Sequence, residues 1–447
     1  MSQWKRVFGG KAVSLLSLAA LLSCRAVCAA DGFGEVNSPA EANESKVVAL
    51  VNARIIDATG RKPIERGTLI VAGTKVVAVG KLTEVEIPKD CQQIDLAGKT
   101  ILPGFIDCHF HSINDLDQPR TFLQHGVTSL RDPGHPFRYY ETVLRAREPM
   151  PRVFLCGGHI DGSPPIWPEQ ASVATSAKRA AEIVREHKEN GATAIKVYFR
   201  LPLELIRAVC VEADRQKIPV TAHLELVKAV DAIDAGVNGI EHATSFGTSL
   251  TESESEVNSF IQAVRQNPSV REELRYRLWS KLNFATNTLL ESVIQRVVQN
   301  RVFVSPTLAV HERRATMPKT KEFEVLGFAN MLDFVGRCHK AGAVVVAGSH
   351  TWVPGAEFGW AFQRELELLV EAGLTPMEAL MAGTANGAKF LNISEFCGTL
   401  EVGKYADLVV LDGNPLEDIS VTRSIDRVML NGQWLSKPVL PSADAEN

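Results

Sequence analysis

The sequence predicts an α/β protein: a (β/α)8 TIM barrel that carries a small β-sandwich built from both ends of the chain. The first observation is an alternation of apolar, strand-like runs with amphipathic helical stretches between residues 104 and 395. The second is a pair of β-branched regions, interrupted by glycines, that flank this alternation on both sides. The third is that histidines directly follow several apolar runs, where barrel strands open onto one face.

Length and composition agree with this fold class. The chain has 447 residues, of which 45% are hydrophobic and 22% are charged, as in ordinary folded proteins. The formal net charge is −4 and both signs are scattered, so the sequence predicts no nucleic-acid partner, which would need a basic stripe. The cysteines beyond the N-terminal region are widely spaced and form no CxxC pair. We expect most of them to be small buried side chains.

Residues 1–30 have the pattern of a secretory signal peptide. A basic start precedes the apolar run "AVSLLSLAALLS", and small residues follow in "CRAVCAA". The run is short for a bilayer, so the sequence predicts export, periplasmic or secreted, without a stable membrane span. Two alternatives stay open. The stretch "LLSC" resembles a lipoprotein signal that would anchor the chain at Cys24, and the apolar run could also be retained as an anchor. Residues 31–45 are small and polar, which predicts a linker.

The composite β-sandwich is predicted for residues 46–103 and 396–436. The runs "KVVALVNARIIDATG" and "GTLIVAGTKVVAVG" are β-branched and bounded by turns, which is typical of antiparallel sheets. The same pattern of β-branched runs bounded by turns occurs again in "GTLEVGKYADLVVLDGNP" and "VTRSIDRVMLNGQWL". We therefore expect the two ends of the chain to pair in one small domain, followed by a tail at residues 437–447.

The barrel is predicted for residues 104–395. Its strand candidates include "GATAIKVY", "IPVTAHL", "NGIEHA", "VFVSPTL" and "GAVVVAGS". Helical spacing of apolar residues separates them, for example in "SAKRAAEIVREHKENG", which ends at the capping glycine Gly191. Residues 249–300 are longer and more polar than a barrel connection needs. They predict a helical insertion over the strand ends, either a lid or a plain helical hairpin.

Four histidines and one lysine mark the predicted strand ends. His109 and His111 are two apart on an apolar run, so they would project to the same side. Lys196 lies inside an apolar strand, and His223 and His242 follow two successive strands. Each has an ordinary explanation alone, as a satisfied core histidine or a lysine that reaches solvent or a carboxylate. Together, at one face of a barrel, they predict a metal site.

The ordered motifs "GFIDCHFHS", "AIKVY", "TAHLE", "IEHAT" and "GTLEVGKYADLVVLDGNPLEDI" resemble those of the amidohydrolase superfamily. The resemblance is strongest to its imidazolonepropionase-like and Xaa-Pro dipeptidase-like branch, which "VTSLRDPG" and "LCGGHIDG" also fit. It extends from Val47 to Leu435. It implies a metal-dependent TIM-barrel hydrolase that cleaves a C–N amide bond with a metal-bound hydroxide. The implied substrate is a dipeptide, an N-acyl amino acid or a cyclic amide.

The resemblance also implies a ligand set. His109, His111 and Lys196 would help to hold one metal ion, and Lys196, His223 and His242 a second. The implied metal is zinc, with two ions or a single one. The amine of Lys196 would be N6-carboxylated, because a carbamate anion can bridge two cations that an ammonium would repel.

Three further residues are candidates for catalysis and substrate binding. Tyr198 follows Lys196 by two positions and could donate to a developing oxyanion, or it could be a packed barrel residue. His159 could contact substrate or cap a turn. Arg131 could meet a substrate carboxylate or form a buried ion pair. The expected partner is a small amide or peptide substrate, and homo-oligomer formation stays open.

One residue departs from the family pattern. The last barrel strand there normally ends in "GTD" or "GSD", whereas this chain has Gly348, Ser349 and His350. The aspartate would bind a metal and transfer a proton, and a histidine can do either. We expect an active hydrolase in which His350 replaces that aspartate. The alternative is a catalytically impaired or non-catalytic ligand-binding member of the family. A deaminase is disfavoured by Lys196, because deaminases of the superfamily usually hold one metal without a carbamate.

Overall fold

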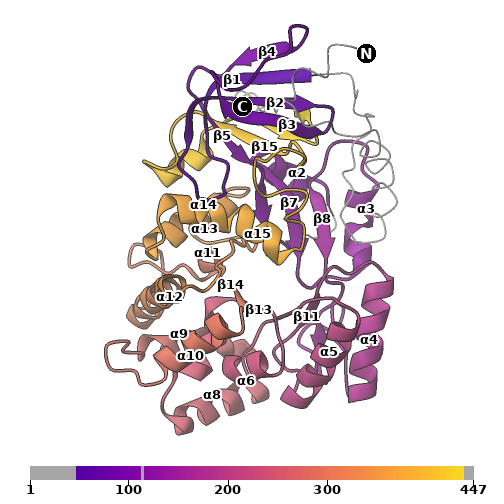
Figure 1. The fold of residues 1–447 in the computed structure, drawn as a ribbon. Coiled ribbons are helices and arrows are strands. Elements are labelled where there is room, and N and C mark those ends of the chain that lie inside the picture. Colours follow the sequence, from indigo (N-terminus) through magenta and orange to yellow (C-terminus); the bar gives the residue numbers. More distant parts are fainter. Residues whose placement is uncertain (1–46, 112–114, 437–447) are drawn as a thin grey trace, which may run out of the picture.

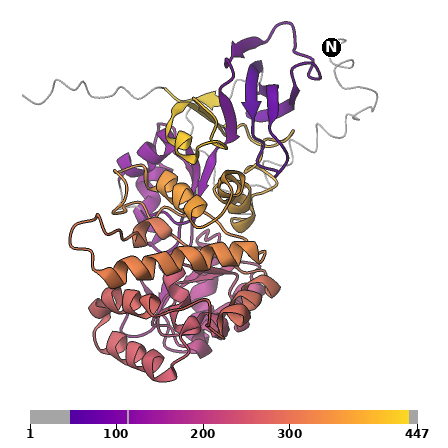
Figure 2. The ribbon, with the colours of Figure 1, turned by 90° about the vertical axis from the view of Figure 1, so that its left-hand side faces the viewer.

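The computed structural model describes residues 47–111 and 115–436 (Figure 1). The predicted signal peptide, linker and C-terminal tail lie outside the described residues. Strands from both ends of the chain gather at one end of the molecule, and the parallel strands with their helices form the other end (Figures 1 and 2). Within the described ranges, no helix is long and apolar enough to cross a membrane.

Both ends of the chain share one sheet, as the sequence predicts. Its strand order is β17-β16-β15-β5-β1-β2-β3, and β4 pairs with β1. Antiparallel pairing of β15 with β5 joins the C-terminal to the N-terminal strands. The strands are β1 (Val47–Ile55), β2 (Ile64–Ala72), β3 (Lys75–Lys81), β4 (Gln92–Asp95), β5 (Thr100–Pro103), β15 (Leu408–Leu411), β16 (Ile425–Leu430) and β17 (Gln433–Trp434).

The strands of this domain, which the sequence predicts as a β-sandwich, form one continuous hydrogen-bonded path. Strand β1 changes partners along its length: Val48 to Val51 pair with β4, whereas Arg54 and Ile55 pair with β5. A register shift in β1 after Leu50 separates these two halves. The shift lets one strand bend and take part in both halves of the domain.

The barrel strands form a ring of parallel pairs. One arc is β6-β7-β8 and the other is β9-β11-β12-β13-β14, with β10 beside β9. The ring closes at the eighth position, where Val345 bridges to Val304 and the carbonyl of Ala347 accepts from the amide of Cys108 at 2.9 Å. The strands are β6 (Phe105–Asp107), β7 (Val127–Asp132), β8 (Arg152–Leu155), β9 (Ile160–Asp161), β10 (Ser172–Val173), β11 (Ile195–Val197), β12 (Val220–Ala222), β13 (Gly239–Glu241) and β14 (Phe303–Ser305).

Helices connect and surround these strands (Figure 1). The predicted helix before β11 begins after the capping residue Ser176 and ends before Gly191, whose φ of +89° suits a glycine. The α-helices are α2 (Asp117–Gln124), α3 (Glu141–Leu144), α4 (Ala177–Glu189), α5 (Leu203–Arg215), α6 (Ala229–Asp234), α7 (Gly247–Leu250), α8 (Glu254–Gln266), α9 (Arg271–Ser280), α10 (Leu290–Gln299), α11 (Leu308–His311), α12 (Glu322–Lys340), α13 (Ala361–Glu371), α14 (Pro376–Ala382) and α15 (Ala385–Phe390). Short 3-10 turns are η1 (Phe137–Tyr140), η2 (Ala243–Phe246), η3 (Pro268–Val270) and η4 (Ile419–Arg423).

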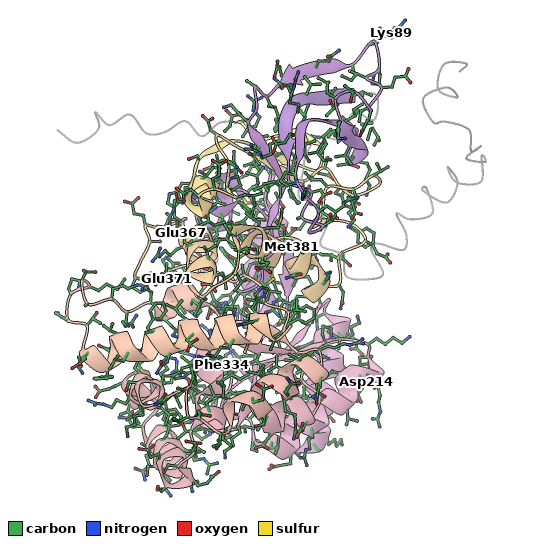
Figure 3. The ribbon with its side chains drawn as sticks, turned by 60° about the vertical axis from the view of Figure 1, so that its left-hand side comes forward. Lys89, Asp214, Phe334, Glu367, Glu371 and Met381 are labelled. Atoms are coloured by element: carbon green, nitrogen blue, oxygen red, sulfur yellow. The ribbon has the colours of Figure 1, made fainter. Side chains whose placement is uncertain are left out.

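The insertion between β13 and β14 is helical, as predicted, and α9 within it is anchored to the long helix α12. The ring of Phe334 on α12, labelled in Figure 3, lies 5.7 Å from that of Trp279 on α9 and 4.9 Å from that of Phe246. The side-chain amide of Asn330 on α12 also donates to the carbonyl of Trp279 at 2.8 Å. Packing of this kind holds α9 in a fixed position above the carboxyl ends of the strands.

Candidate metal centre

A cavity of about 320 Å³ opens where the barrel strands end. Eight of the chain's 11 histidines line it, together with Lys196 and Tyr198. Those histidines are His109, His111, His135, His159, His223, His242, His311 and His350. The sequence-predicted metal ligands are therefore brought together on one face. So many imidazoles in one cavity are costly to bury without a ligand, because each ring nitrogen needs a partner.

Three of these imidazoles form a compact group. His109, His111 and His350 each offer a ring nitrogen, and these atoms lie within 4.8 Å of one another. The Nε2 atoms of His109 and His111 are 3.1 Å apart, and the ring of His350 stacks on that of His109 at 5.2 Å between centroids. Burial lowers the pKa of His109 to about 4 and that of His350 to about 3. Neutral imidazoles at this spacing suit a shared cation.

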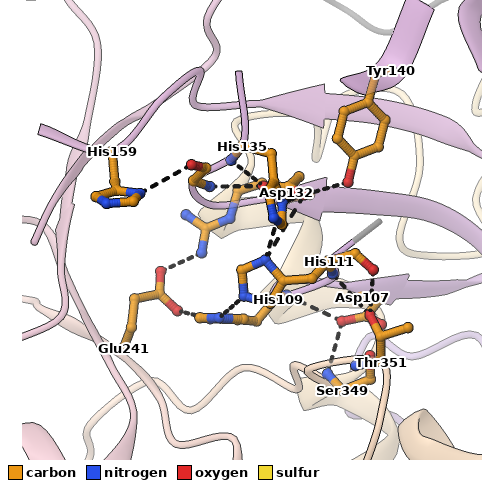
Figure 4. Close-up of polar contacts among 12 residues, drawn as sticks. Asp107, His109, His111, Asp132, His135, Tyr140, His159, Glu241, Ser349 and Thr351 are labelled. Carbon is orange, nitrogen blue, oxygen red and sulfur yellow. Dashed lines mark hydrogen bonds and ion pairs between the residues drawn. The ribbon is translucent and has the colours of Figure 1, made fainter. Parts of the chain in front are cut away.

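A close approach of the first and eighth strands produces this stacking. A Cβ atom on Gly348 would lie 2.6 Å from the Cβ of His109, so only glycine fits there. The buried carboxylate of Asp107 accepts from the backbone amides of His109, at 3.1 Å, and Ser349, at 2.9 Å (Figure 4). The amide of His350 donates to the carbonyl of His109 at 2.7 Å. These contacts fix the two histidine backbones against each other.

Glu241 is a buried anion behind the cavity wall. Its Oε2 lies 2.7 Å from Nδ1 of His109 (Figure 4). Its Oε1 accepts from the guanidinium of Arg131 and the hydroxyl of Thr221. Burial alone would raise the pKa of Glu241, but Arg131, Lys196 and His109 bring it well below its usual value. An ionised Glu241 orients His109 so that Nε2 faces the cavity.

Arg131 does not reach the cavity, although the sequence suggested a substrate contact. Its side chain is 1% exposed, and its Nε donates to the carbonyl of Cys108 at 2.8 Å. Arg131 instead forms a buried ion pair with Glu241, which is the other interpretation that the sequence allowed. Arg131 positions Glu241 rather than a substrate.

Lys196 is buried at the centre of the histidine group. Its residue is 3% exposed, and burial lowers the pKa of its amine to about 8. Among the described residues, no carboxylate oxygen lies within 4.0 Å of its Nζ. His223 and His242 follow β12 and β13, and their rings are 4.4 Å apart. The buried amine therefore lacks a carboxylate partner among the described residues, and a group added at this position could interact with it.

Two of the cavity histidines have left-handed backbone conformations. The φ angle is +65° at His242 and +60° at His350, and Thr307 and Thr351 beside them have +47° and +67°. Side chains other than glycine adopt this region at a cost, so strain of this kind indicates a functional site. The threonines offset it with contacts: Thr307 Oγ1 lies 2.7 Å from Nδ1 of His242, and Thr351 Oγ1 donates to the carbonyl of His111 at 2.8 Å.

The sequence pattern of the amidohydrolase family matches residues 100–435. The chain belongs to this family. Among the curated relatives of this amidohydrolase is the ochratoxinase of Aspergillus niger, 24% identical over 470 aligned positions that cover 89% of this chain and 88% of the relative. An imidazolonepropionase of Haloarcula marismortui is 39% identical, over only 80 residues or 17% of this chain.

Solved structures confirm the fold of this amidohydrolase. A Xaa-Pro dipeptidase with methionine bound in its active site superimposes with a TM-score of 0.67 at 19% identity, over 87% of this chain and all of that chain. A prolidase complexed with N-methylphosphonate-L-proline gives a TM-score of 0.64 at 22% identity, over 88% of this chain and all of that one. At these identities the similarity establishes the barrel architecture.

The amidohydrolase cavity also contains histidines that the sequence did not single out. His135 follows β7, and its Nδ1 lies 2.7 Å from Oδ2 of Asp132 (Figure 4). With His111 these residues form a second group of potential metal ligands. His311 follows β14, is 3% exposed, and neither of its ring nitrogens has a hydrogen-bond partner among the described residues. Both histidines come shortly after an apolar run, which is the signal that could have identified them.

Tyr198 and His159 line the same cavity on the side of β9 and β11. Their rings are 4.3 Å apart, and the Tyr198 ring is 4.8 Å from that of His223. The Tyr198 hydroxyl accepts from Nε1 of Trp167 at 3.2 Å, which leaves its own hydrogen free to donate. Nδ1 of His159 lies 3.1 Å from the carbonyl of Gly134. Both predicted residues are thus accessible to a molecule in the cavity.

Replacing Thr307 by valine is expected to lower the metal affinity of this amidohydrolase roughly 10- to 100-fold. The hydroxyl of Thr307 fixes the orientation of the His242 ring, and valine has the same shape without it. Competition between the protein and a chromogenic chelator for added zinc measures the affinity. Thr307→Ser keeps the hydroxyl and serves as the control, with near wild-type affinity. Equal affinities for the valine and serine variants would contradict this role.

Proposed function

We propose that the chain is an exported, metal-dependent amidohydrolase that cleaves the C–N bond of a dipeptide, an N-acyl amino acid or a cyclic amide. The observation that carries the proposal is a group of neutral imidazoles around a buried lysine in one cavity of a chain of this family. The likeness to ochratoxinase and to prolidase structures supports the substrate class. Export rests on the pattern of residues 1–30.

The donor set fits a zinc centre. His109, His111 and His350 would hold one ion, and His223 and His242 a second, with a carbamate on Lys196 shared between the two. The lowered pKa of Lys196 favours the carbamate, because only the neutral amine reacts with carbon dioxide. Imidazole-rich sites suit zinc. When bound, the ions would activate water and polarise the scissile carbonyl.

The remaining cavity residues would orient the substrate. Tyr198 has a hydroxyl hydrogen free to donate to the carbonyl oxygen as negative charge develops on it. The unpartnered Nε2 of His159 faces the same side and would hold a polar group of the substrate. Trp167 also lines the cavity and donates to the Tyr198 hydroxyl from its indole nitrogen.

His350 takes, in this proposal, the position of the aspartate that ends the last barrel strand in the superfamily. A pKa of about 3 keeps its imidazole neutral at physiological pH, which is the form that binds metal. The same low pKa makes it a weak proton acceptor. We therefore assign His350 first to metal binding, in the group it forms with His109 and His111.

Metal-dependent turnover tests the function. We expect purified protein to hydrolyse members of a panel of dipeptides and N-acyl amino acids, to lose activity on chelation and to regain it with zinc and bicarbonate. Elemental analysis is expected to give two zinc ions per chain. A fully zinc-loaded protein that turns over no member of the panel would rule out the proposal.

The second candidate is a non-catalytic ligand-binding protein on the same scaffold. The observation that favours it is His350. Compared with the aspartate of the superfamily pattern, this histidine lacks a negative charge and is a weaker proton acceptor. It predicts a wild-type protein that binds zinc without turnover, and a His350→Asp variant that gains turnover.

A further inference from the structure

The helical insertion between β13 and β14 contributes charged side chains to the cavity. One of its helices, α9, begins at Arg271, and the first turns of this helix line the cavity with Arg271, Glu272 and Arg275. The two arginines are four residues apart, so they lie on one face of the helix. The amino end of a helix also carries partial positive charge. The structure therefore places a cationic helix end above the candidate metal ligands.

Arg271 has no anionic partner within the part of the chain that the structure describes. Its guanidinium lies 4.9 Å from the centre of the Phe199 ring, and its Nε is buried without a hydrogen-bond partner. Other basic residues of the insertion are paired on the outside, for example Arg277 with Glu273 at 2.6 Å and Lys281 with Glu256 at 2.6 Å. Of these basic residues, Arg271 is the one that lines the cavity, and it forms no ion pair at contact distance with a described carboxylate.

Arg275 is more deeply buried and only loosely paired. The residue is 7% exposed, and its Nε also lacks a hydrogen-bond partner among the described residues. Its nearest carboxylates are Glu272, at 3.4 Å, and the buried Glu225, at 3.7 Å. The side chain of Glu272 is 70% exposed, so solvent screens its charge. A guanidinium that lines the cavity and is only loosely paired is a place for an incoming anion.

The distance from these arginines to the candidate metal centre is short. One oxygen of Glu225 lies 3.7 Å from the Arg275 guanidinium and 3.4 Å from Nε2 of His223. In an N-acyl amino acid or a dipeptide, three bonds separate the scissile carbonyl carbon from the carboxylate carbon. A substrate whose carbonyl lies beside His223 can therefore extend its carboxylate to the helix end.

We propose that Arg271 and Arg275 form an anion subsite that binds the free carboxylate of the substrate. The preferred substrates are then linear amides that carry a carboxylate beside the scissile bond, N-acyl amino acids and dipeptides, rather than uncharged cyclic amides. This inference rests on the proposed hydrolase function and narrows its substrate class. Arg271 and Arg275 would take the role that the sequence suggested for Arg131.

Binding of matched probes tests the subsite without turnover. N-Methylsulfonyl-L-leucine resists amide hydrolysis, and its carboxamide differs only in charge. We expect the zinc-loaded full chain to bind the carboxylate roughly 10- to 100-fold more tightly than the carboxamide by calorimetry, since hydrogen bonds to charged groups are strong. Arg271→Gln is expected to abolish most of this preference and leave the carboxamide affinity unchanged, and Arg271→Lys to retain part of it.

Arg277→Gln is the matched control, because Arg277 lies on the same helix, is exposed and pairs outside the cavity. It is expected to keep the wild-type preference. Equal affinities of the wild type for the two probes, equal losses for both in Arg271→Gln, or no binding of either would overturn the inference. Failure of the hydrolase proposal looks different: no panel member is hydrolysed, while the preference for the carboxylate probe persists.

Discussion

Replacing Glu241 by glutamine is expected to destabilise the metal-free protein by about 3–5 kcal/mol. Glu241 is fully buried, and its partner Arg131 is 1% exposed. Glutamine has the same shape, but it leaves the Arg131 charge inside the protein without an anion. It also weakens the hydrogen bond that orients His109. Urea unfolding in the presence of a chelator measures the loss.

The same substitution is expected to change the pH dependence of stability. Arg131, Lys196 and His109 overcome the effect of burial and lower the folded-state pKa of Glu241. Its stabilisation is therefore fully present above the unfolded pKa of about 4.3 and is lost as pH falls through the folded value. The difference in unfolding free energy between wild type and Glu241→Gln should shrink below about pH 4.

A double variant provides the control. Arg131→Met removes the charge that Glu241→Gln leaves unpaired, so the two together are expected to be less destabilising than the sum of the single changes. Additive losses would show that the two side chains do not act as a pair.

The candidate metal ligands could be predicted from the sequence because the barrel fold brings residues that are far apart in the chain to one place. His109, His223 and His242 each follow an apolar run, and parallel strands of one barrel end on one face. A local pattern repeated along the chain therefore predicts a site in space. Lys196 could be recognised for the same reason, since a lysine inside an apolar run has few structural explanations.

The wall of the cavity could not be predicted in this way. Arg271 lies in a helix of the insertion, beyond the strand ends, where no periodicity relates sequence position to the cavity. In α9 the residues Arg271 and Arg277 look alike, yet one faces the cavity and the other pairs with Glu273 outside. The partners of β1 could not be predicted for a related reason: the pairing of one long strand with both β4 and β5 depends on register, which composition does not encode.

Replacing His350 by asparagine is expected to lower kcat/KM on the best panel substrate roughly 10²- to 10⁴-fold. Asparagine adopts the left-handed backbone that His350 requires at φ +60°, so the fold should tolerate it. An uncharged amide is a poor zinc ligand, and the group with His109 and His111 would lose one of its three nitrogens. Steady-state kinetics together with zinc content per chain measure the effect.

Replacing His350 by aspartate is expected to keep kcat/KM within about tenfold of wild type, because a carboxylate can bind metal and also accept a proton. Aspartate tolerates the same φ, so any difference from asparagine reflects charge and ligation rather than strain. The added negative charge beside two dications should tighten the second zinc ion, which a zinc titration would detect as higher affinity. If wild type and His350→Asn turn over equally slowly while His350→Asp gains several orders of magnitude, imidazole does not support catalysis here, and the chain is the binding protein of the second candidate.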